Sequence, residues 1–309
     1  MTSPFGPLQI IANPSAGRGR NAALPRVVAA CADRGLAHSV ALTRGPGDAS
    51  RLATEAVVDR GVRFVVAVGG DGTVHEVVNG LVDARTGRPH AEGVAFGAVA
   101  GGSGCDFIRT FGLDRAPERA VARFEGETVF PIDLGRVTLL GRDGAERTAL
   151  FANIAEAGYG GLVTDLANRM PKALGKSRYL IAILTAIRRF ELVRARVSVD
   201  HTTVEEPLSN VIVANGQFFG GGLKVAPRAL PDDGLFNVQL WRGEVKDVFK
   251  MTPKLRVGEH LTSPDVREYQ SSTVTVDAER PLLVEADGEV LGTTPARFDL
   301  LPKVLDLKI

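Results

Sequence analysis

The stretch VVAVGGDGTVHEVVNGL (residues 65–81) holds the most informative pattern in the chain. A run of apolar residues ends at Gly69 and Gly70, and Asp71 then stands between glycines. From Thr73 onward, the valines and a leucine recur at the i, i+3, i+4, i+7 spacing of one helix face. The pattern predicts a buried strand that passes through Gly-Gly-Asp-Gly-Thr directly into a helix packed on a sheet.

The glycines of this stretch favour a ligand that the backbone itself binds. They let backbone N–H groups approach a ligand closely, and a helix N-terminus adds unpaired N–H groups and a partial positive charge. A phosphate suits these groups, but the carboxylate of Asp71 would repel it. Magnesium resolves the conflict, because it binds phosphate oxygens together with one or two carboxylates. The alternative is a sharp strand-to-helix turn in which Asp71 is only the N-cap.

Strands and helices alternate through the first third of the chain. This alternation predicts a parallel sheet with helices on both faces, in which ligands bind at the carboxyl ends of the strands. The loops NPSAGRGR, TRGPGD, GGDGT and GGSGCDF all follow predicted strands, so we expect them to gather at one edge of the sheet. The expected strands are residues 8–13, 38–43, 62–68 and 94–100, and the expected helices are residues 21–34, 48–60 and 73–81.

Two of these loops allow a more specific interpretation. GGSGCDF (residues 101–107) again combines glycines with a hydroxyl, Ser103, and a carboxylate, Asp106, although a glycine-rich turn capped by Asp106 explains it equally well. NPSAGRGR contains a GxGxxA spacing, which is a weak signal for dinucleotide binding. The next strand ends at Thr43 and Arg44, without the acidic residue that would hold an NAD ribose.

Beyond about residue 133 the pattern becomes that of a β-rich domain. A helical stretch from about residue 163 to residue 190 interrupts it, and the shift of pattern near Pro131 marks a boundary between two domains. Segments separated by Gly, Asp or Pro predict strands within residues 136–140, 148–155, 195–201, 208–216, 236–241, 273–278 and 281–288.

The composition limits the class of protein. A chain of 309 residues with 44% hydrophobic and 24% charged residues suits a soluble protein of one large or two ordinary domains. Its net charge of +1 argues against a nucleic-acid partner bound through bulk charge. Cys31 and Cys105 form no disulfide framework or CxxC pair, so a reducing cytoplasm is the expected setting. The N-terminus lacks a signal-peptide pattern, and the apolar run at residues 179–187 is too short to span a bilayer.

The chain carries NPSAGRGR, GGDGTVHEVVNGL, GSGCDF, GQFFGGGLKVAPRALPDDGLFNV and EADGE in that order. This series resembles the diacylglycerol kinase catalytic family, which includes YegS-like and DgkB-like lipid kinases, sphingosine kinases and ceramide kinases. The resemblance implies a doubly wound α/β domain that binds ATP, a C-terminal β-sandwich, and a last strand that returns to the first domain. We therefore expect an ATP-binding domain at residues 1–132 plus 297–309 and a β-rich lipid-substrate domain at residues 133–296.

The resemblance also implies roles for individual residues. Asp71, with Asp106, would hold the catalytic Mg²⁺ through water. Asp287 matches the general base that accepts the proton of the lipid hydroxyl, and Glu289 would face the same side of an extended strand. Taken alone, ADGE is more typical of a plain hairpin turn. The positions that match nucleotide contacts are Asn13, Thr43, Gly69, Gly70, Asp71, Gly72, Thr73, Ser103 and Asp106.

The other matches carry weaker implications. RALPDDGLFNV resembles a structural magnesium loop, to which Leu230 and Leu235 would give backbone carbonyls and Asp233 a carboxylate. An ordinary Asp-Gly turn explains that stretch equally well. Asp133 matches an acidic position that orders the site. Cys105 departs from the family pattern, because many relatives read GTGNDF, so any hydrogen bond made by that asparagine amide is missing here.

A local excess of basic residues favours contact with a lipid surface. Clustered Lys and Arg gain about 1 kcal/mol each beside an anionic leaflet, so we expect this segment to dock peripherally on the membrane. The alternative is a core helix with solvated basic flanks. The acidic residue among them is Glu191, and the basic residues are Arg169, Lys172, Lys176, Arg178, Arg188, Arg189, Arg194 and Arg196.

The leading interpretation is an ATP-dependent lipid kinase, with ATP and Mg²⁺ as cofactors and a lipid such as diacylglycerol as its partner at the membrane surface. A sphingoid-base or ceramide kinase is the first alternative. An NAD kinase shares GGDGT, but NPSAG, HEVVNGL and ADGE disfavour it. A non-catalytic nucleotide-binding regulator is disfavoured by the presence of Asp71, Asp106, Asp287 and Glu289. We expect no nucleic-acid partner, and a homodimer is left open.

Overall fold

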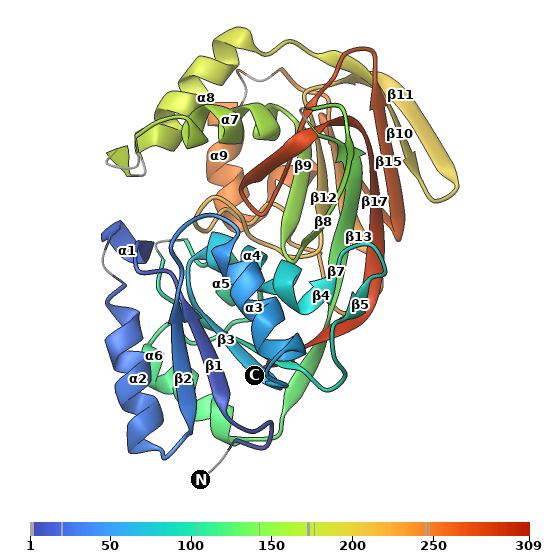
Figure 1. The fold of residues 1–309 in the computed structure, drawn as a ribbon. Coiled ribbons are helices and arrows are strands. Elements are labelled where there is room, and N and C mark those ends of the chain that lie inside the picture. Colours follow the sequence, from blue (N-terminus) through green and yellow to red (C-terminus); the bar gives the residue numbers. More distant parts are fainter. Residues whose placement is uncertain are drawn as a thin grey trace. The chain divides into compact units, whose positions relative to one another are not determined.

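Strands and helices alternate in the first third of the chain, as the sequence pattern predicts (Figure 1). The chain divides into unit 1, made of residues 1–134 and 301–309, and unit 2, made of residues 135–300. The computed structural model describes residues 3–19, 21–102, 104–141, 143–171, 174–175, 177–244, 246 and 248–309.

The sheet of unit 1 is parallel, with the strand order β2-β1-β3-β6-β17. Strands β1 and β3 are buried along their whole length, because helices cover both faces of the sheet. The carboxyl ends of β1, β3 and β6 therefore meet at one edge. The strands are β1 (Leu8–Ala12), β2 (His38–Leu42), β3 (Phe64–Gly69), β6 (Ala95–Ala100) and the end of β17 (Glu289–Lys308).

The helices of unit 1 cover the two faces of this sheet. Figure 1 shows α2 (Ala23–Asp33) and α6 (Pro117–Ala122) on one face and α3 (Asp48–Val58) and α4 (Asp71–Leu81) on the other. The predicted doubly wound α/β architecture is confirmed. Shorter elements lie between them: α1 (Ala16–Gly19), β4 (Val82–Asp83), β5 (Arg88–Pro89), α5 (Asp106–Thr110) and η1 (Arg123–Glu125).

Two long strands belong to both units. Strand β7 (Val129–Leu140) begins in unit 1 and continues into unit 2, and β17 returns from unit 2 to unit 1. Residues Asp306 and Leu307 of β17 pair with β6. Within unit 1, the buried Asp133 accepts the backbone N–H of Lys303 at 2.7 Å, which fixes the returning strand.

Unit 2 is built from two sheets that share a hydrophobic core. One sheet has the order β14-β13-β12-β9-β16-β17, and β17 continues into the other sheet beside β15, β10 and β11, with β7 and β8. Inward-facing residues of both sheets, such as Val213, Phe236 and Phe298, are fully buried. The strands are β8 (Glu146–Phe151), β9 (Ile154–Gly158), β10 (Val193–Val199), β11 (Thr202–Leu208), β12 (Asn210–Ala214), β13 (Phe236–Trp241), β14 (Val266–Ser271), β15 (Thr273–Ala278) and β16 (Leu283–Ala286).

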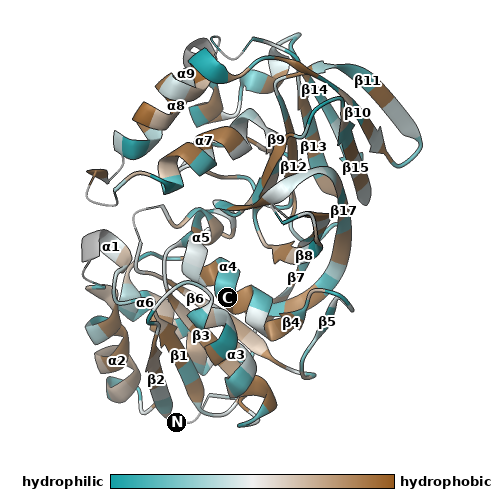
Figure 2. Cartoon of the chain, turned by 45° about the horizontal axis from the view of Figure 1, so that its top comes forward, coloured by the Kyte–Doolittle hydropathy of each residue, from teal (hydrophilic) through white to brown (hydrophobic). Residues whose placement is uncertain are grey.

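The helices of unit 2 lie on the outer face of the β9-containing sheet (Figure 1). The predicted single helical stretch is wrong, because α7 (Tyr159–Asn168) and α8 (Ser177–Arg189) are separate helices with Pro171 between them. The sequence pattern did not predict α9 (Val248–Val257), which precedes the short η4 (His260–Thr262). Figure 2 shows hydrophobic residues concentrated on the strands, whereas α8 carries both hydrophobic and hydrophilic residues.

Candidate active site

Strand β3 runs directly into helix α4 through the GGDGT motif. Helix α4 begins at Asp71, and Gly70 precedes it in an extended conformation. The N–H groups of Thr73 and Val74 donate to the carbonyl of Gly70 at 3.0 and 3.2 Å and close the first turn. The motif therefore places a helix N-terminus at the carboxyl end of a buried parallel strand, an arrangement that favours an anionic ligand.

The loop after β6 lies directly against this motif. The N–H of Gly102 donates to the carbonyl of Gly69 at 3.1 Å. A Cβ on Gly102 would lie 2.6 Å from the Cα of Gly70, so the two backbones touch without room for a side chain. Contact between the loops thus requires glycine, apart from any ligand. We call residues 69–72 and 101–102 the glycine cradle.

The loop after β1 adds to this edge. The Nδ2 of Asn21 donates to the carbonyls of Asn13 and Val68 at 3.0 and 2.9 Å, so it joins the ends of β1 and β3. A Cβ on Gly17 would lie 2.6 Å from the carbonyl oxygen of Gly101. Within the described residues, the buried Oδ1 of Asn21 has no hydrogen-bond partner. An acceptor is therefore available beside the cradle.

Asp71 connects the GGDGT loop to helix α5, which follows the second loop of the glycine cradle. Its Oδ1 accepts the backbone N–H of Phe107 at 3.0 Å, in the first turn of α5. The carboxylate of Asp106 is buried, and its Oδ1 forms an ion pair with Arg109 at 2.5 Å. Burial raises the pKa of the Cys105 thiol, and the negative charges of Asp71 and Asp106 add to the shift. Two acidic groups therefore flank the start of α5.

The residues that follow GGDGT in α4 hold helix α3. The Oε2 of Glu76 accepts the N–H of Ala49 at 3.0 Å, at the start of α3. A Cβ on Gly80 would lie 2.2 Å from the carbonyl oxygen of Ser50, so the close approach of the two helices requires glycine there. The EVxNG part of the motif thus serves packing, whereas GGDGT forms the candidate site.

The other predicted nucleotide contacts lie at neighbouring strand ends. The N–H of Thr43 donates to the carbonyl of Ala12 at 3.0 Å, just beyond β2. The Oδ1 of Asn13 accepts the N–H of Ser15 at 2.9 Å, just beyond β1. Both side chains are half-buried at the edge that carries the glycine cradle. Ser103 lies outside the described residues, so its contact with a nucleotide stays a prediction.

In unit 2, Asp287 lies in the turn between β16 and β17 with both carboxylate oxygens engaged. Its Oδ2 accepts the N–H of Ala152 at 2.8 Å, and its Oδ1 accepts those of Asn153 and Ile154 at 3.0 and 3.1 Å. The N–H of Asp287 donates to the carbonyl of Ile154 at 2.9 Å. These contacts fix the carboxylate to the segment between β8 and β9. We call residues 286–289 the carboxylate turn.

Asp287 and Glu289 do not share one extended strand, so that prediction is wrong. Asp287 has a φ of +49° and Gly288 a φ of +90°, both in the left-handed region. Strand β17 begins only at Glu289, whose side chain is exposed. The chain reverses here, so the alternation of side chains along a strand does not apply.

Sequence reasoning missed a second pair of acids beside this turn. Glu156 in β9 and Glu285 in β16 are direct cross-strand neighbours, and they are 3% and 4% exposed. The signal is present in the sequence, because each acid stands between apolar residues of a buried strand. A buried carboxylate is costly unless something compensates it, so this pair requires a physical explanation.

The loop that resembles a structural magnesium site forms an Asp-Gly turn. The Oδ1 of Asp233 accepts the N–H of Leu235 at 2.9 Å, and Gly234 has a φ of +79°. Among the described residues, no group of three or more His, Cys, Asp or Glu side chains is arranged to hold a metal ion. Metal binding through Leu230, Asp233 and Leu235 stays a prediction.

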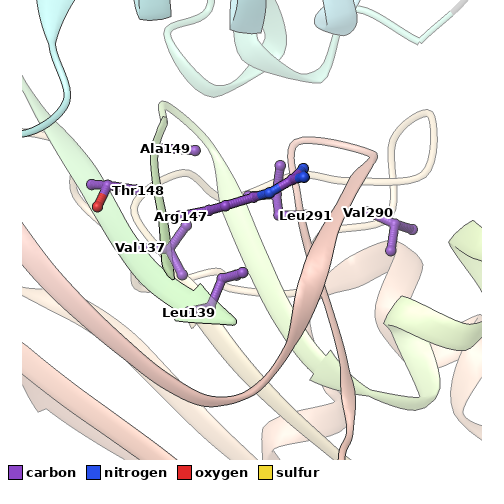
Figure 3. Close-up of a pocket in the computed structure, with 7 residues that line it drawn as sticks. All are labelled: Val137, Leu139, Arg147, Thr148, Ala149, Val290 and Leu291. Atoms are coloured by element: carbon purple, nitrogen blue, oxygen red, sulfur yellow. The ribbon is translucent and has the colours of Figure 1, made fainter. Parts of the chain in front are cut away.

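A small cavity of about 140 Å³ lies in unit 2 between β7, β8 and the start of β17 (Figure 3). This volume is smaller than the about 300–1,000 Å³ of typical ligand pockets, so the cavity is not assigned as the expected lipid site. Arg147 crosses the cavity among aliphatic side chains, and its guanidinium pairs with Asp143 at 2.8 Å. The lining residues are Val137, Leu139, Arg147, Thr148, Ala149, Val290 and Leu291.

Comparison with known families matches both parts of the chain. Residues 7–137 match the diacylglycerol kinase catalytic domain, and residues 153–309 match the YegS C-terminal NAD kinase beta sandwich-like domain. A solved structure of a diacylglycerol kinase from Bacillus anthracis has a TM-score of 0.70 at 20% identity and covers 99% of this chain and 97% of its own. This likeness supports the fold.

Two curated relatives cover most of the chain. A diacylglycerol kinase from Mycobacterium tuberculosis is 29% identical over 98% of this chain and 95% of its own length. A protein from Pseudomonas aeruginosa, named a probable lipid kinase YegS-like, is 32% identical over 90% of this chain and 86% of its own. The family suggested by the motifs is therefore confirmed, and with it the class of enzyme. The chain belongs to the family of diacylglycerol kinase-like and YegS-like lipid kinases.

Proposed function

We propose that the protein transfers the γ-phosphate of ATP to a hydroxyl group of a lipid such as diacylglycerol. The observation that carries this proposal is the glycine cradle, two loops that are hydrogen-bonded to each other at the ends of neighbouring parallel strands, with Asp71 bound to the N–H of Phe107 in α5. Its backbone N–H groups and helix N-terminus suit the phosphates of a nucleotide. Diacylglycerol is named in the description of the Mycobacterium tuberculosis relative and supplies the acceptor class.

ATP would lie along the carboxyl edge of the unit 1 sheet. The loop 69–73 would bind the phosphates through its backbone. Asn13 and Thr43, at the ends of β1 and β2, would contact the rest of the nucleotide. The resemblance to the family assigns a further nucleotide contact to Ser103.

Magnesium fits the acids beside the glycine cradle. Carboxylates and phosphate oxygens are the ligands that it prefers, often through water. Asp71 is tethered to the N–H of Phe107, next to the loop where the phosphates would lie. Asp106, which pairs with Arg109, directly precedes Phe107 in the chain. Bound there, the ion would neutralise charge on the transferring phosphoryl group, and Asp71 would orient it.

The carboxylate turn would supply the base for the reaction. The lipid hydroxyl oxygen forms a bond to the γ-phosphorus while the bond from that phosphorus to the bridging oxygen breaks, and ADP leaves. The hydroxyl proton passes to the carboxylate of Asp287. Hydrogen bonds from Ala152, Asn153 and Ile154 hold this carboxylate in one orientation. Glu289 would add an exposed negative charge that orients the acceptor.

A second, structural Mg²⁺ would be held by Leu230, Asp233 and Leu235. Its removal would loosen the turn before β13 without touching the chemistry. The melting temperature should therefore fall on addition of EDTA and recover with Mg²⁺. An Asp233→Ala variant should melt alike with and without Mg²⁺. If the wild-type protein melts at the same temperature under both conditions, this second site does not exist.

Helix α8 would form the membrane contact. Leu180, Ile181 and Leu184 are 54%, 41% and 48% exposed, whereas Ala182 and Ala186 are buried beneath them. Arg188 and Arg189 end the helix. Apolar residues flanked by arginines suit the interface of an anionic bilayer. Within the described ranges, every helix is too short or too polar to cross a bilayer.

The predicted basic segment needs a correction at its C-terminal end. Arg196 belongs to β10 and pairs with Glu205 of β11 at 2.9 Å, and Arg194 approaches Glu205 and Glu279 at 3.8 and 3.7 Å. These two arginines therefore have acidic partners at the surface of β10 and β11 and do not belong to helix α8. Lys172 and Lys176 lie outside the described residues.

Sedimentation with liposomes tests this contact. Binding should increase with the content of anionic lipid and fall when Arg188 and Arg189 are both changed to Glu. The matched control reverses the charge at Arg196, which lies in the sheet. If binding ignores anionic lipid or survives the α8 reversal, the membrane proposal fails.

The test of the function is transfer of labelled γ-phosphate from Mg-ATP to a panel of lipids in mixed micelles. The panel contains diacylglycerol, a sphingoid base, ceramide and phosphatidylglycerol, with NAD in a parallel tube. Labelled phosphatidic acid is the expected product. Label in a sphingoid base or ceramide would favour a sphingoid-base or ceramide kinase. Label in NADP would contradict a lipid kinase and favour an NAD kinase. ATP binding without transfer to any acceptor would favour a nucleotide-binding regulator.

A further inference from the structure

Unit 2 buries two glutamates that the proposed chemistry does not use. In β9, Glu156 stands between Ala155 and Ala157, and in β16, Glu285 stands between Val284 and Ala286. The flanking residues belong to the core between the sheets. Successive side chains of a strand point to opposite faces, so both glutamates lie on the outer face, beneath the helices.

The start of helix α7 seals the pair from water. A Cβ on Gly160 would lie 2.2 Å from the Oε2 of Glu156, so only a residue without a side chain fits there. A Cβ on Gly161 would lie 2.3 Å from the carbonyl oxygen of Leu283, which brings α7 equally close to β16. The two glycines at the start of α7 are therefore shaped to the glutamates and the strand that they cover.

Glu156 and Glu285 are direct cross-strand neighbours, and burial raises the pKa of both carboxyl groups. Two ionised carboxylates buried side by side would repel each other, so the pair favours a state in which the two groups share one proton. The Oε1 of Glu156 also accepts a hydrogen bond from the Nδ2 of Asn210 at 2.8 Å, which favours its ionised form. Burial, and after it the charge of Glu156, raise the pKa of Glu285 well above its usual value, which favours the protonated form of Glu285.

The groups that face the pair add little positive charge. Burial raises the pKa of the phenols of Tyr159 in α7 and Tyr179 in α8, and the nearby charges of Glu156 and Glu285, respectively, add to these shifts. The carboxylate of Asp287 in the turn adds a further negative charge near Glu285. The positive charge of Arg178 acts in the opposite sense on Tyr179, because it lowers the pKa of that phenol. The pair thus carries a single negative charge near the N-terminus of α7, which favours it.

Glu285 also holds the carboxylate turn directly. Its Oε2 accepts the backbone N–H of Gly288 at 2.8 Å, between Asp287 and Glu289. On the neighbouring strand, Glu156 follows the segment whose N–H groups bind Asp287. The Nδ2 of Asn168 in α7 donates to the carbonyl of Gly288 at 3.2 Å, so both polar groups of this glycine are held.

We propose that Glu285, buried beside Glu156 and bound to the backbone N–H of Gly288, is a positioning residue that fixes the Asp287–Glu289 turn for phosphoryl transfer. The inference rests on the proposed kinase function for its catalytic meaning. Its structural content is independent of that function. A protonated acid both donates to Glu156 and accepts from Gly288, and a glutamine amide does the same with its Nε2 and Oε1. Alanine does neither.

The test compares Glu285→Gln with Glu285→Ala by amide hydrogen exchange and by lipid phosphorylation. We expect Glu285→Gln to exchange like the wild type in the peptide that contains Gly288, and Glu285→Ala to exchange about tenfold faster there. In the kinase assay, Glu285→Ala should lower kcat with little change in KM for ATP, and Glu285→Gln should restore it. As the pH rises, the wild type should lose activity earlier than Glu285→Gln, because only the wild type can lose the shared proton.

The two readouts separate the possible failures. Equal exchange in the alanine variant and the wild type would overturn the inference, as would identical pH profiles in the wild type and Glu285→Gln. If the wild type phosphorylates no lipid but the exchange pattern is as expected, the proposed function fails and the positioning of the turn stands. If Glu285→Ala does not fold, Gly160→Ala provides the same test, since its new methyl group would press on Glu156.

Discussion

The glycine cradle of unit 1 and the carboxylate turn of unit 2 differ in how their residues are brought together. The cradle consists of contiguous glycines at the ends of β3 and β6, and its hydrogen bonds run mostly between backbone groups. The carboxylate turn depends on side chains from separate strands, since Asp287 is held by residues 152–154 and Gly288 by Glu285. The first is a local motif, and the second is a product of strand register.

This difference implies that the two regions respond oppositely to mutation. In the cradle, adding a side chain is harmful to stability where the backbones touch, as at Gly102. In the turn, removing a side chain is harmful, because buried donors such as the N–H of Ile154 lose their acceptor. Both regions would act in one reaction, so the same assay can compare them.

The largest effect is expected from Asp287→Asn. Transfer should fall by about 10²–10⁴-fold, because the amide cannot accept the hydroxyl proton. The amide also turns an NH₂ group toward a backbone N–H, which costs about 1–3 kcal/mol of stability. The measurement is the kinase assay together with thermal unfolding. Glu289→Gln is the matched control for stability, because it removes a charge from the same turn at an exposed position. Transfer that persists in Asp287→Asn would show that the base is another group.

The next effect is a contrast between Gly102→Ala and Gly70→Ala within the cradle. A Cβ on Gly102 meets the Cα of Gly70 at 2.6 Å, so the substitution should cost about 1–3 kcal/mol of stability. A Cβ on Gly70 lies 3.6 Å from the Cα of Gly102, an ordinary contact, so that variant should melt like the wild type. It should nevertheless bind ATP more weakly by calorimetry, because the methyl group blocks the approach of a phosphate. Unchanged ATP affinity would remove the cradle from the binding site.

The contrast also explains what the sequence could reveal. GGDGT and its helix were predictable because glycines, a carboxylate and a periodic apolar face stand next to one another. The partners of Asp287 lie about 135 positions away in the chain, and nothing local identifies them. The pairing of Glu156 with Glu285 likewise depends on the register of β9 and β16. Each acid is unusual in a strand that the sequence predicts to be buried, and this is a signal for an interaction. Only the fold shows that the two acids are neighbours.

The role of Glu76 was hidden for the same reason. Its place in HEVVNGL marks it as part of the family motif, whereas its contact with the N–H of Ala49 depends on how α3 packs against α4. The local pattern does not reveal the break between α7 and α8, because apolar residues continue on both sides of Pro171. Local sequence patterns therefore predict the strands and helices at the edge that carries the glycine cradle. The roles of individual residues become clear only from their tertiary contacts.

A smaller effect is the pH dependence of stability in Glu285→Gln. The folded-state pKa of Glu285 is raised above its ordinary value of 4.5, so the folded state holds the proton more tightly than the unfolded state. This stabilisation is fully present below pH 4.5 and is lost as the pH rises through the folded-state pKa. The variant cannot lose that proton, so its advantage in melting temperature over the wild type should grow with pH. A constant difference across the pH range would contradict a shared proton.

The smallest effect is expected at Cys105, where the chain departs from the family pattern. Cys105 adopts the left-handed conformation, with φ and ψ of 56° and 50°. Its Sγ lies 3.4 Å from the carbonyl oxygen of Gly102 and 3.9 Å from that of Gly69, both weak contacts for a thiol. Asparagine tolerates this conformation better, and its amide can donate to the same carbonyls. Cys105→Asn should therefore stabilise the protein by about 0.5–1 kcal/mol in thermal unfolding.

Cys105→Gly separates the two contributions to this gain. Glycine relieves the backbone strain but donates no hydrogen bond from a side chain, and it leaves a void where the buried thiol was. If hydrogen bonding dominates, asparagine should raise the melting temperature and glycine should not. If glycine matches asparagine, the left-handed backbone is the main cost at this position. If both variants melt below the wild type, cysteine packs better against the cradle than asparagine or glycine does. The stability of a glycine motif would then depend on side-chain packing as much as that of the carboxylate turn does.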